Sequence, residues 1–257
     1  MANGIRPKKH LGQHFLADQN IAKKIAGSIS HNQGYLLEIG PGTGSLTQFL
    51  IETWGEKLWL VEIDPDAIGS LHHSFPALVP RIVEGDFLTL DLSALFNHNK
   101  LNIIGNFPYN ISSQILFRVI AMRKQVIQLA GMFQDEVAKR ICSPPGNRGY
   151  GILSVLVQAY FETEYLFSVT PNVFIPPPAV NSGVIRLVTK QDFELRCSDI
   201  FFKTVVKTAF NQRRKKLSNA LSGMASKADI GAPYAGMRAE QLSWRDFEEL
   251  ACRISGK

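Results

Sequence analysis

Short apolar runs alternate with longer amphipathic stretches over the first 190 residues of this 257-residue chain. The runs are rich in β-branched residues and are bounded by glycine, proline or polar clusters, which is typical of buried strands. Strands that alternate with helices form a mostly parallel sheet, so we expect an α/β fold with helices on both faces of the sheet. The predicted strands are 35–39, 58–63, 81–83, 101–104 and 126–133, followed by an antiparallel pair near 160–169 and 183–188.

After about residue 190 the pattern becomes purely helical. Ser198 is placed to cap a helix whose apolar face continues to Leu221. Ser243, with Asp246 three residues later, has the pattern of a capping box at the start of a last helix. We expect two domains, which are a larger α/β domain over residues 1–189 and a small all-helical domain over residues 190–257.

A glycine-rich loop follows the first predicted strand and opens a helix. Glycine lets the backbone turn tightly and approach a ligand without a Cβ clash. The loop reads G-x-G-x-G with Ser45 next, so it is neither the dinucleotide pattern G-x-G-x-x-G nor a Walker phosphate loop. Together with the acid two residues before it, the loop resembles the S-adenosylmethionine (SAM) loop of Rossmann-like methyltransferases. By this resemblance the cofactor-binding residues here are Glu38, Gly40 and Gly42.

Two later acids end the next two predicted strands. Glu62 stands 22 residues after Gly40, where a carboxylate can accept hydrogen bonds from both ribose hydroxyls of an adenosine. Asp64 is the alternative for that role. Asp86 can accept from the adenine amino group of the cofactor, and Phe87 offers an apolar contact beside it. Each acid alone would be an ordinary solvated strand end, but their spacing after the glycine loop favours a SAM site.

The tetrapeptide 106–109, Asn-Phe-Pro-Tyr, follows the fourth predicted strand. The lone pair of an adenine amino nitrogen is delocalised into the ring, so the nitrogen is a poor nucleophile. The side-chain oxygen of Asn106 and the carbonyl of Pro108 can accept its two hydrogens and localise that lone pair. Tyr109 can stack on the base, and such stacking is worth about 1–3 kcal/mol. We therefore predict that Asn106, Pro108 and Tyr109 are catalytic, although an Asn-Pro turn is also common after a strand.

Positive charge gathers at both ends of the chain. Of the net charge of +6, residues 1–24 carry +4 and residues 190–257 carry +5, whereas residues 25–189 carry −3. This pattern is compatible with a polyanion bound by both ends or with basic tails that keep a protein soluble. The chain start lacks the apolar core of a secretory signal, so we expect a cytoplasmic protein. The three cysteines and six histidines show no ligand spacing, and we expect no metal.

On these motifs the chain resembles the ribosomal RNA adenine N6,N6-dimethyltransferase family, in its bacterial small-subunit branch. The N-terminal stretch 12–16, Gly-Gln-His-Phe-Leu, matches a family segment that folds over the cofactor. The proline-rich stretch 174–182 matches the family's substrate loop. The stretch 210–221, which contains the four consecutive basic residues 213–216, matches its basic C-terminal helix-turn. The resemblance places Gln13, His14 and Leu16 at the methionine end of SAM. It assigns substrate contacts to Phe174, Arg213 and Arg214, with Phe174 stacking on the base opposite Tyr109.

The resemblance implies dimethylation of two adjacent adenines in small-subunit (16S-type) rRNA within an immature ribosomal subunit. SAM is the implied co-substrate, rRNA the partner, and a membrane partner is not expected. We also expect a monomer. The sequence departs from the family where Phe107 and Ala179 stand, since the family usually has Leu and Lys there. The first change should leave both acceptors in place, and the second removes a possible phosphate contact.

Three other functions remain open at this stage. An antibiotic-resistance methyltransferase of large-subunit rRNA shares the catalytic loop, and a DNA adenine methyltransferase usually carries a paired-proline loop where Phe107 stands. A non-catalytic assembly factor would keep the fold without the chemistry, and the intact catalytic loop argues against it.

Overall fold

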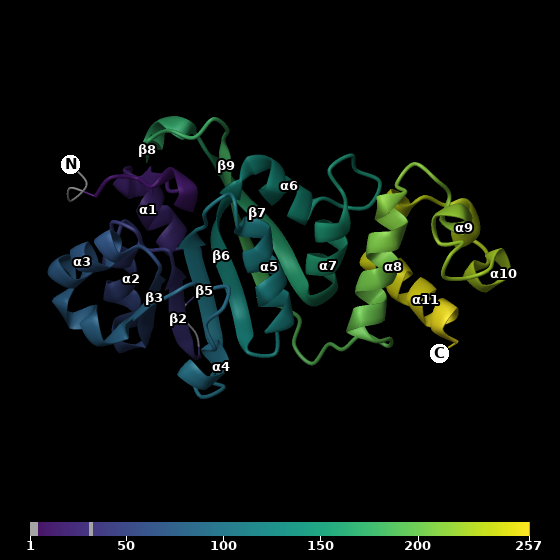
Figure 1. Ribbon diagram of the computed structural model, residues 1–257, viewed down its shortest axis with the longest axis horizontal. Coiled ribbons are helices and arrows are strands. Elements are labelled where there is room, and N and C mark those ends of the chain that lie inside the picture. The colour runs from purple at the N-terminus through teal and green to yellow at the C-terminus, as the bar shows by residue number, and fades with distance from the viewer. Residues whose placement is uncertain (1–4, 31–32, 257) are drawn as a thin grey trace. The chain divides into compact units, whose positions relative to one another are not determined.

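A seven-stranded sheet, with the order β4-β3-β2-β5-β6-β9-β7, forms the centre of the α/β part (Figure 1). The structure is a computed structural model and describes residues 5–30 and 33–256. A separate two-stranded sheet pairs β1 with β8. The strands are β1 Phe15–Leu16, β2 Tyr35–Ile39, β3 Leu58–Glu62, β4 Ile82–Glu84, β5 Leu101–Asn106, β6 Val126–Gln134, β7 Phe161–Val169, β8 Phe174–Ile175 and β9 Ser182–Thr189.

Most neighbouring strands of the large sheet run parallel. The pairs β2–β3, β2–β5, β3–β4 and β5–β6 are parallel, whereas β6 and β9 are antiparallel. The last two strands, β9 and β7, are neighbours at the edge of the sheet. The predicted α/β class is confirmed, and each strand of the large sheet lies within a few residues of its predicted range, whereas β1 and β8 were not predicted. The carboxyl ends of β2, β3 and β5 therefore meet at one edge.

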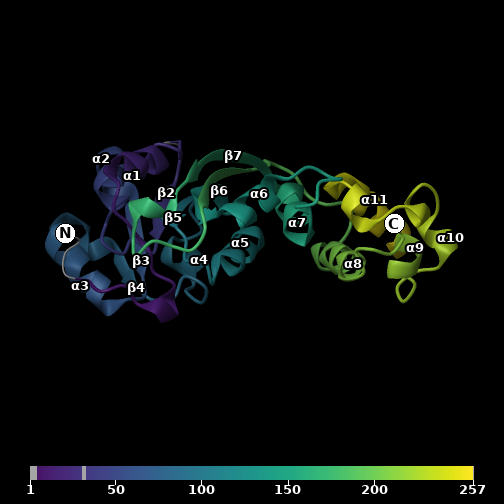
Figure 2. The same cartoon turned by 90° about the horizontal axis from the view of Figure 1, so that it is seen from above.

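Helices cover both faces of this sheet. Figure 2 shows α1 and α2 on one face and α4 and α5 on the other. No helix among the described residues is long and apolar enough to cross a membrane. The helices are α1 Gln19–Ala26, α2 Thr47–Trp54, α3 Pro65–Ser74, α4 Leu92–Leu95, α5 Ser112–Ala121, α6 Asp135–Cys142, α7 Ile152–Tyr160, α8 Asp199–Asn211, α9 Leu217–Ala220, α10 Lys227–Ile230 and α11 Trp244–Ser255.

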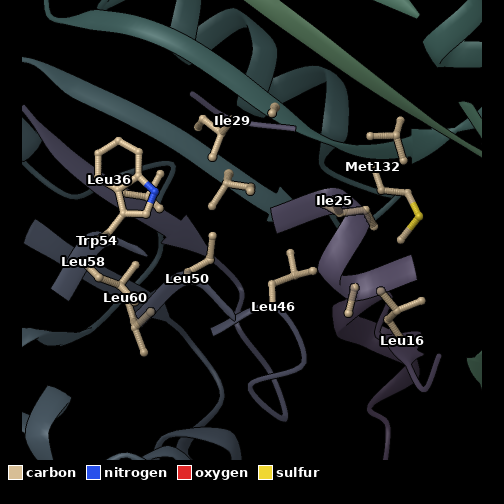
Figure 3. Close-up of a cluster of buried hydrophobic side chains, with 14 of the residues drawn as sticks. Leu16, Ile25, Ile29, Leu36, Leu46, Leu50, Trp54, Leu58, Leu60 and Met132 are labelled. Carbon is tan, nitrogen blue, oxygen red and sulfur yellow. The ribbon is translucent and has the colours of Figure 1, made fainter. Parts of the chain in front are cut away.

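A hydrophobic cluster joins the sheet to α1, α2 and the N-terminal segment (Figure 3). Side chains two apart on a strand point to the same face, so Leu58 and Leu60 of β3 both enter the cluster. Ile25 of α1 and Leu50 of α2 meet them from the helical layer. Burial of a side chain of this size contributes roughly 1.5–3 kcal/mol, so this cluster holds the layers together.

The basic stretch interrupts the predicted C-terminal helix, and this part of the expectation was wrong. Helix α8 ends at Asn211, and α9 begins only at Leu217. Lys216 has extended backbone angles, φ −63° and ψ 150°, and forms an isolated β-bridge with Arg238. The amide of Leu217 donates to the carbonyl of Met237 at 2.8 Å. These contacts with a distant segment replace the helical hydrogen bonds that the apolar periodicity predicts.

The two predicted helix caps differ in outcome. Ser198 precedes α8 but makes no side-chain capping bond. At α11 the predicted capping box is confirmed, because the Ser243 hydroxyl accepts from the Asp246 amide at 3.2 Å. The Asp246 carboxylate in turn accepts from the Ser243 amide at 2.8 Å. Such a box satisfies two amides that a helix start otherwise leaves unpaired.

The chain divides into two compact units. The first contains residues 1–138 and 164–189, and the second contains residues 139–163 and 190–257. The expected domains 1–189 and 190–257 stay a prediction, but residues 139–163 group with the C-terminal helices in the second unit. The reason is α7, which is apolar and almost wholly buried and packs on α8 and α11.

Two buried tyrosines of the second unit provide a test of its hydrogen bonding. The hydroxyl of Tyr150 is buried without a partner among the described residues, whereas that of Tyr160 donates to Asp199 at 2.8 Å. A buried polar group without a partner destabilises the fold, and a bond to a charged group contributes about 1.5–3 kcal/mol. We expect Tyr150→Phe to leave the free energy of unfolding unchanged or raised, and Tyr160→Phe to lower it by about 1.5–3 kcal/mol. Denaturant titration of both variants measures this, and a loss in Tyr150→Phe equal to that in Tyr160→Phe would contradict it.

Candidate active site

One pocket lies at the carboxyl ends of β2, β3 and β5, wholly within the first unit, and has a volume of about 260 Å³. Parallel strands end at the same edge of a sheet, so the residues that follow each strand gather there. The predicted residues on its wall are Gln13, His14, Leu16, Glu38, Gly40, Gly42, Glu62, Asp86, Phe87, Asn106, Pro108 and Tyr109.

The glycine loop forms the floor of the pocket after β2. Gly40 and Gly42 have φ angles of +63° and +55°, which L side chains rarely adopt. A Cβ on Gly40 would meet no atom within 4 Å, so its backbone is open to a ligand. A Cβ on Gly42 would lie 3.0 Å from the ring of Phe15, which packs directly over the loop. Both positions therefore favour glycine because of their backbone conformation, and Gly42 also because a side chain would collide with Phe15.

Glu38 is a buried carboxyl group beneath the loop, with 1% of its surface exposed. Burial, opposed by the hydrogen bond from the Thr47 hydroxyl at 2.7 Å, raises the pKa of Glu38 to about 8. Thr47 was not predicted, although a hydroxyl residue in the first turn after a glycine loop is a recognisable signal. With this pKa the carboxyl group is largely protonated at neutral pH, and a bound ligand that brings positive charge would favour its ionised form.

Glu62 ends β3 and faces the pocket, whereas Asp64 does not line it. The Glu62 carboxylate accepts from the amides of Gly42 at 3.0 Å, Ile63 at 2.8 Å and Asp64 at 3.0 Å. Burial raises the pKa of Glu62, and these three bonds oppose the rise. The oxygens of Asp64 are bonded instead to Lys8, Gln13 and the amide of Asp66. The geometry favours Glu62 over Asp64 as the ribose ligand.

Asp86 and Phe87 form the far wall of the pocket, after β4. One Asp86 carboxylate oxygen accepts from the amide of Leu88 at 2.8 Å, which fixes the loop. The Phe87 ring is buried and lies 5.1 Å from the Arg118 guanidinium of α5. Arg118 also donates to the carbonyl of Leu90. Burial lowers the pKa of Arg118, and Asp86 opposes that change.

The catalytic loop after β5 presents two oxygen acceptors. The amide nitrogen of Asn106 donates to the His14 carbonyl at 2.9 Å, so Oδ1 is the atom left to accept from a ligand. The Pro108 carbonyl already accepts from the amide of Ile111 at 3.2 Å, and a carbonyl oxygen retains a second lone pair. The Tyr109 hydroxyl shares a 2.6 Å hydrogen bond with Ser182, and burial raises the pKa of Tyr109. This bond was not predicted, because Ser182 is 73 residues away in sequence.

Phe107 packs beneath this loop and explains one departure from the family pattern. Its ring is buried and lies 4.9 Å from that of Phe133. Gly105 and Gly131 are paired across β5 and β6, and a Cβ on either would lie within 3 Å of the Phe107 ring. The larger aromatic side chain therefore fits because neither neighbour has a side chain. Ala179, the other departure, is exposed.

An N-terminal strap, defined here as residues 8–16, covers the pocket. Lys8 bonds to Asp64 at 2.5 Å, and the Gln13 side-chain amide donates to Asp64 at 2.8 Å. The His14 ring stacks on Tyr109 with 5.6 Å between centroids. Lys8 was predicted only as part of the basic N-terminal region, because its partner Asp64 is 56 residues away.

Three predicted substrate residues lie elsewhere than on the pocket wall. Phe174 of β8 is 3% exposed and packs in the hydrophobic cluster with Leu16. Arg213 is held within the second unit by Glu240 at 3.2 Å and by the carbonyl of Arg148 at 3.0 Å. Arg214 is exposed. Their substrate roles stay predictions, and Arg213 also has a structural role that its sequence did not indicate.

Comparison with known proteins places these features in one family. The sequence profile described as Ribosomal RNA adenine dimethylase matches residues 4–252. A Porphyromonas gingivalis protein named Ribosomal RNA small subunit methyltransferase A is 51% identical over 250 residues, covering 96% of each chain. A protein of the same name from Flavobacterium johnsoniae is 47% identical over 253 residues, covering 97% of this chain and 96% of that one. The crystal structure of a dimethyladenosine transferase from Plasmodium falciparum has the same fold, with a TM-score of 0.77 at 24% identity, covering 92% of this chain and 96% of that one.

The buried carboxyl group of Glu38 predicts a pH-dependent stability of the ligand-free protein. Its folded pKa of about 8 exceeds the ordinary value of 4.5, so between these values the folded state holds a proton that the unfolded state has released. The free energy of unfolding should fall as pH rises from 5 to 8, by up to about 1.4 kcal/mol per pH unit. Glu38→Gln should remove this part of the slope, and Glu52→Gln, an exposed acid on α2, should keep it. Denaturant titrations at several pH values measure the slope, and equal slopes in wild type and Glu38→Gln would contradict the prediction.

Proposed function

Because the chain belongs to the ribosomal RNA adenine dimethylase family, we propose that it transfers methyl groups from SAM to N6 of two adjacent adenines in small-subunit rRNA. The product is N6,N6-dimethyladenine, formed while the subunit is still immature. The enzyme acts in the cytoplasm as a monomer. The names of the relatives support the small-subunit substrate over the large-subunit and DNA alternatives.

The orientation of Asn106 is the observation that carries this proposal. Its amide nitrogen is bound by the His14 carbonyl, so the oxygen is the free acceptor beside the Pro108 carbonyl. Two acceptors aimed at the two hydrogens of N6 pyramidalise the nitrogen and free its lone pair. A binding protein without chemistry would not require this arrangement.

The pocket suits a ligand like SAM in charge and shape. Three acids, Glu38, Glu62 and Asp86, surround a loop whose backbone is open at Gly40. Glu62 is proposed to accept from the ribose hydroxyls, and Asp86 from the adenine amino group. Gln13, His14 and Leu16 lie on the strap and are assigned to the methionine end. When bound, SAM supplies an activated methyl group on a cationic sulfur.

Catalysis by these residues is mainly alignment. No strong base is needed, since the Asn106 and Pro108 oxygens hold N6 in line with the methyl group. Alignment of this kind can supply on the order of 7–11 kcal/mol of barrier reduction. Tyr109 holds the base by stacking, and its own position is fixed by Ser182. Phe174 is proposed to stack on the opposite face of the base, which requires its ring to leave the hydrophobic cluster.

Methyl transfer to small subunits that lack the modification tests the function. Labelled SAM should place label in small-subunit RNA as N6,N6-dimethyladenine, with large subunits and DNA unlabelled. Asn106→Ala should lower the rate by about 100-fold or more, as loss of a preorganised polar contact does in other enzymes. Asn99→Ala, outside the pocket, is the matched control. Full activity of Asn106→Ala would disprove the mechanism, and SAM binding without transfer to any substrate would favour the assembly factor.

Arg213 and Arg214 have different environments, so their substitution should affect RNA binding and protein stability differently. Arg214 is exposed and is proposed to contact phosphate, so Arg214→Ala should weaken RNA binding and flatten its salt slope by about 0.7. Arg213→Ala should in addition lower the melting temperature, because its bonds to Glu240 and Arg148 are lost. Binding titrations at several salt concentrations and thermal melts measure both effects. An unchanged salt slope in Arg214→Ala would exclude phosphate contact at this residue.

A further inference from the structure

The N-terminal strap contacts four of the functional parts of the first unit. Besides the glycine loop and the end of β3, it contacts the catalytic loop and the proline-rich substrate loop. The pocket chemistry described above uses its cofactor side and the bond from Asn106 to the His14 carbonyl. Its contacts with Tyr109 and with the substrate loop have no role in that chemistry.

On the cofactor side the strap is anchored by side chains. Lys8 and Gln13 both bond to Asp64, whose carboxylate is fully buried two residues after Glu62. The hydroxyl of Ser45, next to the glycine loop, donates to the carbonyl of Leu16 at 2.7 Å. The strap therefore cannot shift without disturbing the residues around the cofactor.

On the substrate side the contacts converge on His14. Its carbonyl orients the Asn106 amide at 2.9 Å, and its ring lies against Tyr109 with an interplanar angle of 29°. Its Nδ1 is 2.8 Å from the carbonyl of Pro176 in the substrate loop, so Nδ1 donates that hydrogen bond. The His14 side chain thus contacts both the catalytic loop, at Tyr109, and the substrate loop, at Pro176.

A backbone ladder extends this link along the chain. Strand β1 of the strap pairs antiparallel with β8 of the substrate loop, with Leu16 opposite Phe174. The amide of Ala17 continues the ladder by donating to the Val173 carbonyl at 2.8 Å. A displacement of the substrate loop toward the RNA is therefore transmitted to the strap, and the reverse also holds.

We propose that His14 is a positioning residue that couples the two substrates, so that SAM in the pocket raises the affinity for the target RNA. This rests on the proposed function. Coupling between two sites is reciprocal, so RNA must tighten SAM binding by the same factor. Couplings of this kind typically amount to about 5- to 150-fold.

The test compares RNA affinity with and without a bound nucleoside. The Kd of unmodified small subunits is measured for the wild-type chain alone and with saturating S-adenosylhomocysteine. We expect binding about 5-fold tighter or more with the nucleoside. In His14→Ala the ratio should fall toward one, because only the backbone ladder between β1 and β8 then links the strap to the substrate loop. His14→Phe, which keeps a ring against Tyr109 but cannot donate to Pro176, should show a similar fall.

Ser182→Ala is the matched control, because it removes the other partner of Tyr109 and leaves the strap intact. It should slow transfer while keeping the wild-type affinity ratio. A wild-type ratio of one, or a wild-type ratio kept in either His14 variant, would overturn the proposal. Methyl transfer by the wild-type chain, measured in parallel, reports on the proposed function separately. Circular dichroism and the Kd for S-adenosylhomocysteine alone show that each variant is folded.

Discussion

Parallel alignment of β2, β3 and β5 is the constraint on which the site depends. Each strand delivers the next residues of the chain to the same edge, so Glu38, Glu62 and Asn106 meet although they span 68 positions of the sequence. The parallel register in turn requires helical crossovers, and the hydrophobic cluster fixes these helices on the sheet. The position of the pocket is thus set by the direction of the strands, and the side chains at their ends determine what it can bind.

The carboxyl groups placed at this edge work against the stability of the empty protein. Glu38 and Glu62 are taken out of water, and both pKa values rise for that reason. Three backbone amides and one hydroxyl compensate only in part. Buried groups with shifted pKa values that lower the stability of the ligand-free protein are common in sites preorganised for a ligand.

Local patterns predicted the strands of the large sheet and the pocket residues that follow them, because both depend on short apolar runs and on the positions at which these runs end. The strap residues Gln13, His14 and Leu16 came only from the resemblance to the family, and the short strands β1 and β8 were not predicted. Contacts between distant segments were not predictable in this way. The anchoring of Lys8 on Asp64 and the hydrogen bond of Tyr109 to Ser182 join residues more than 50 positions apart. The break between α8 and α9 has the same origin, since the pairing of Lys216 with Arg238 overrides a continuous helical period.

The buried position of Phe174 bears on which molecules this enzyme can modify. If its ring is to stack on a base, it must give up burial worth roughly 1.5–3 kcal/mol. Free adenosine or a short oligonucleotide offers little binding energy to offset that loss. A ribosomal subunit offers a large surface, including phosphates for exposed cations such as Arg214. A preference for large substrates would then follow from the burial of the Phe174 ring in the ligand-free protein. No part of the site would need to recognise the size of the substrate directly.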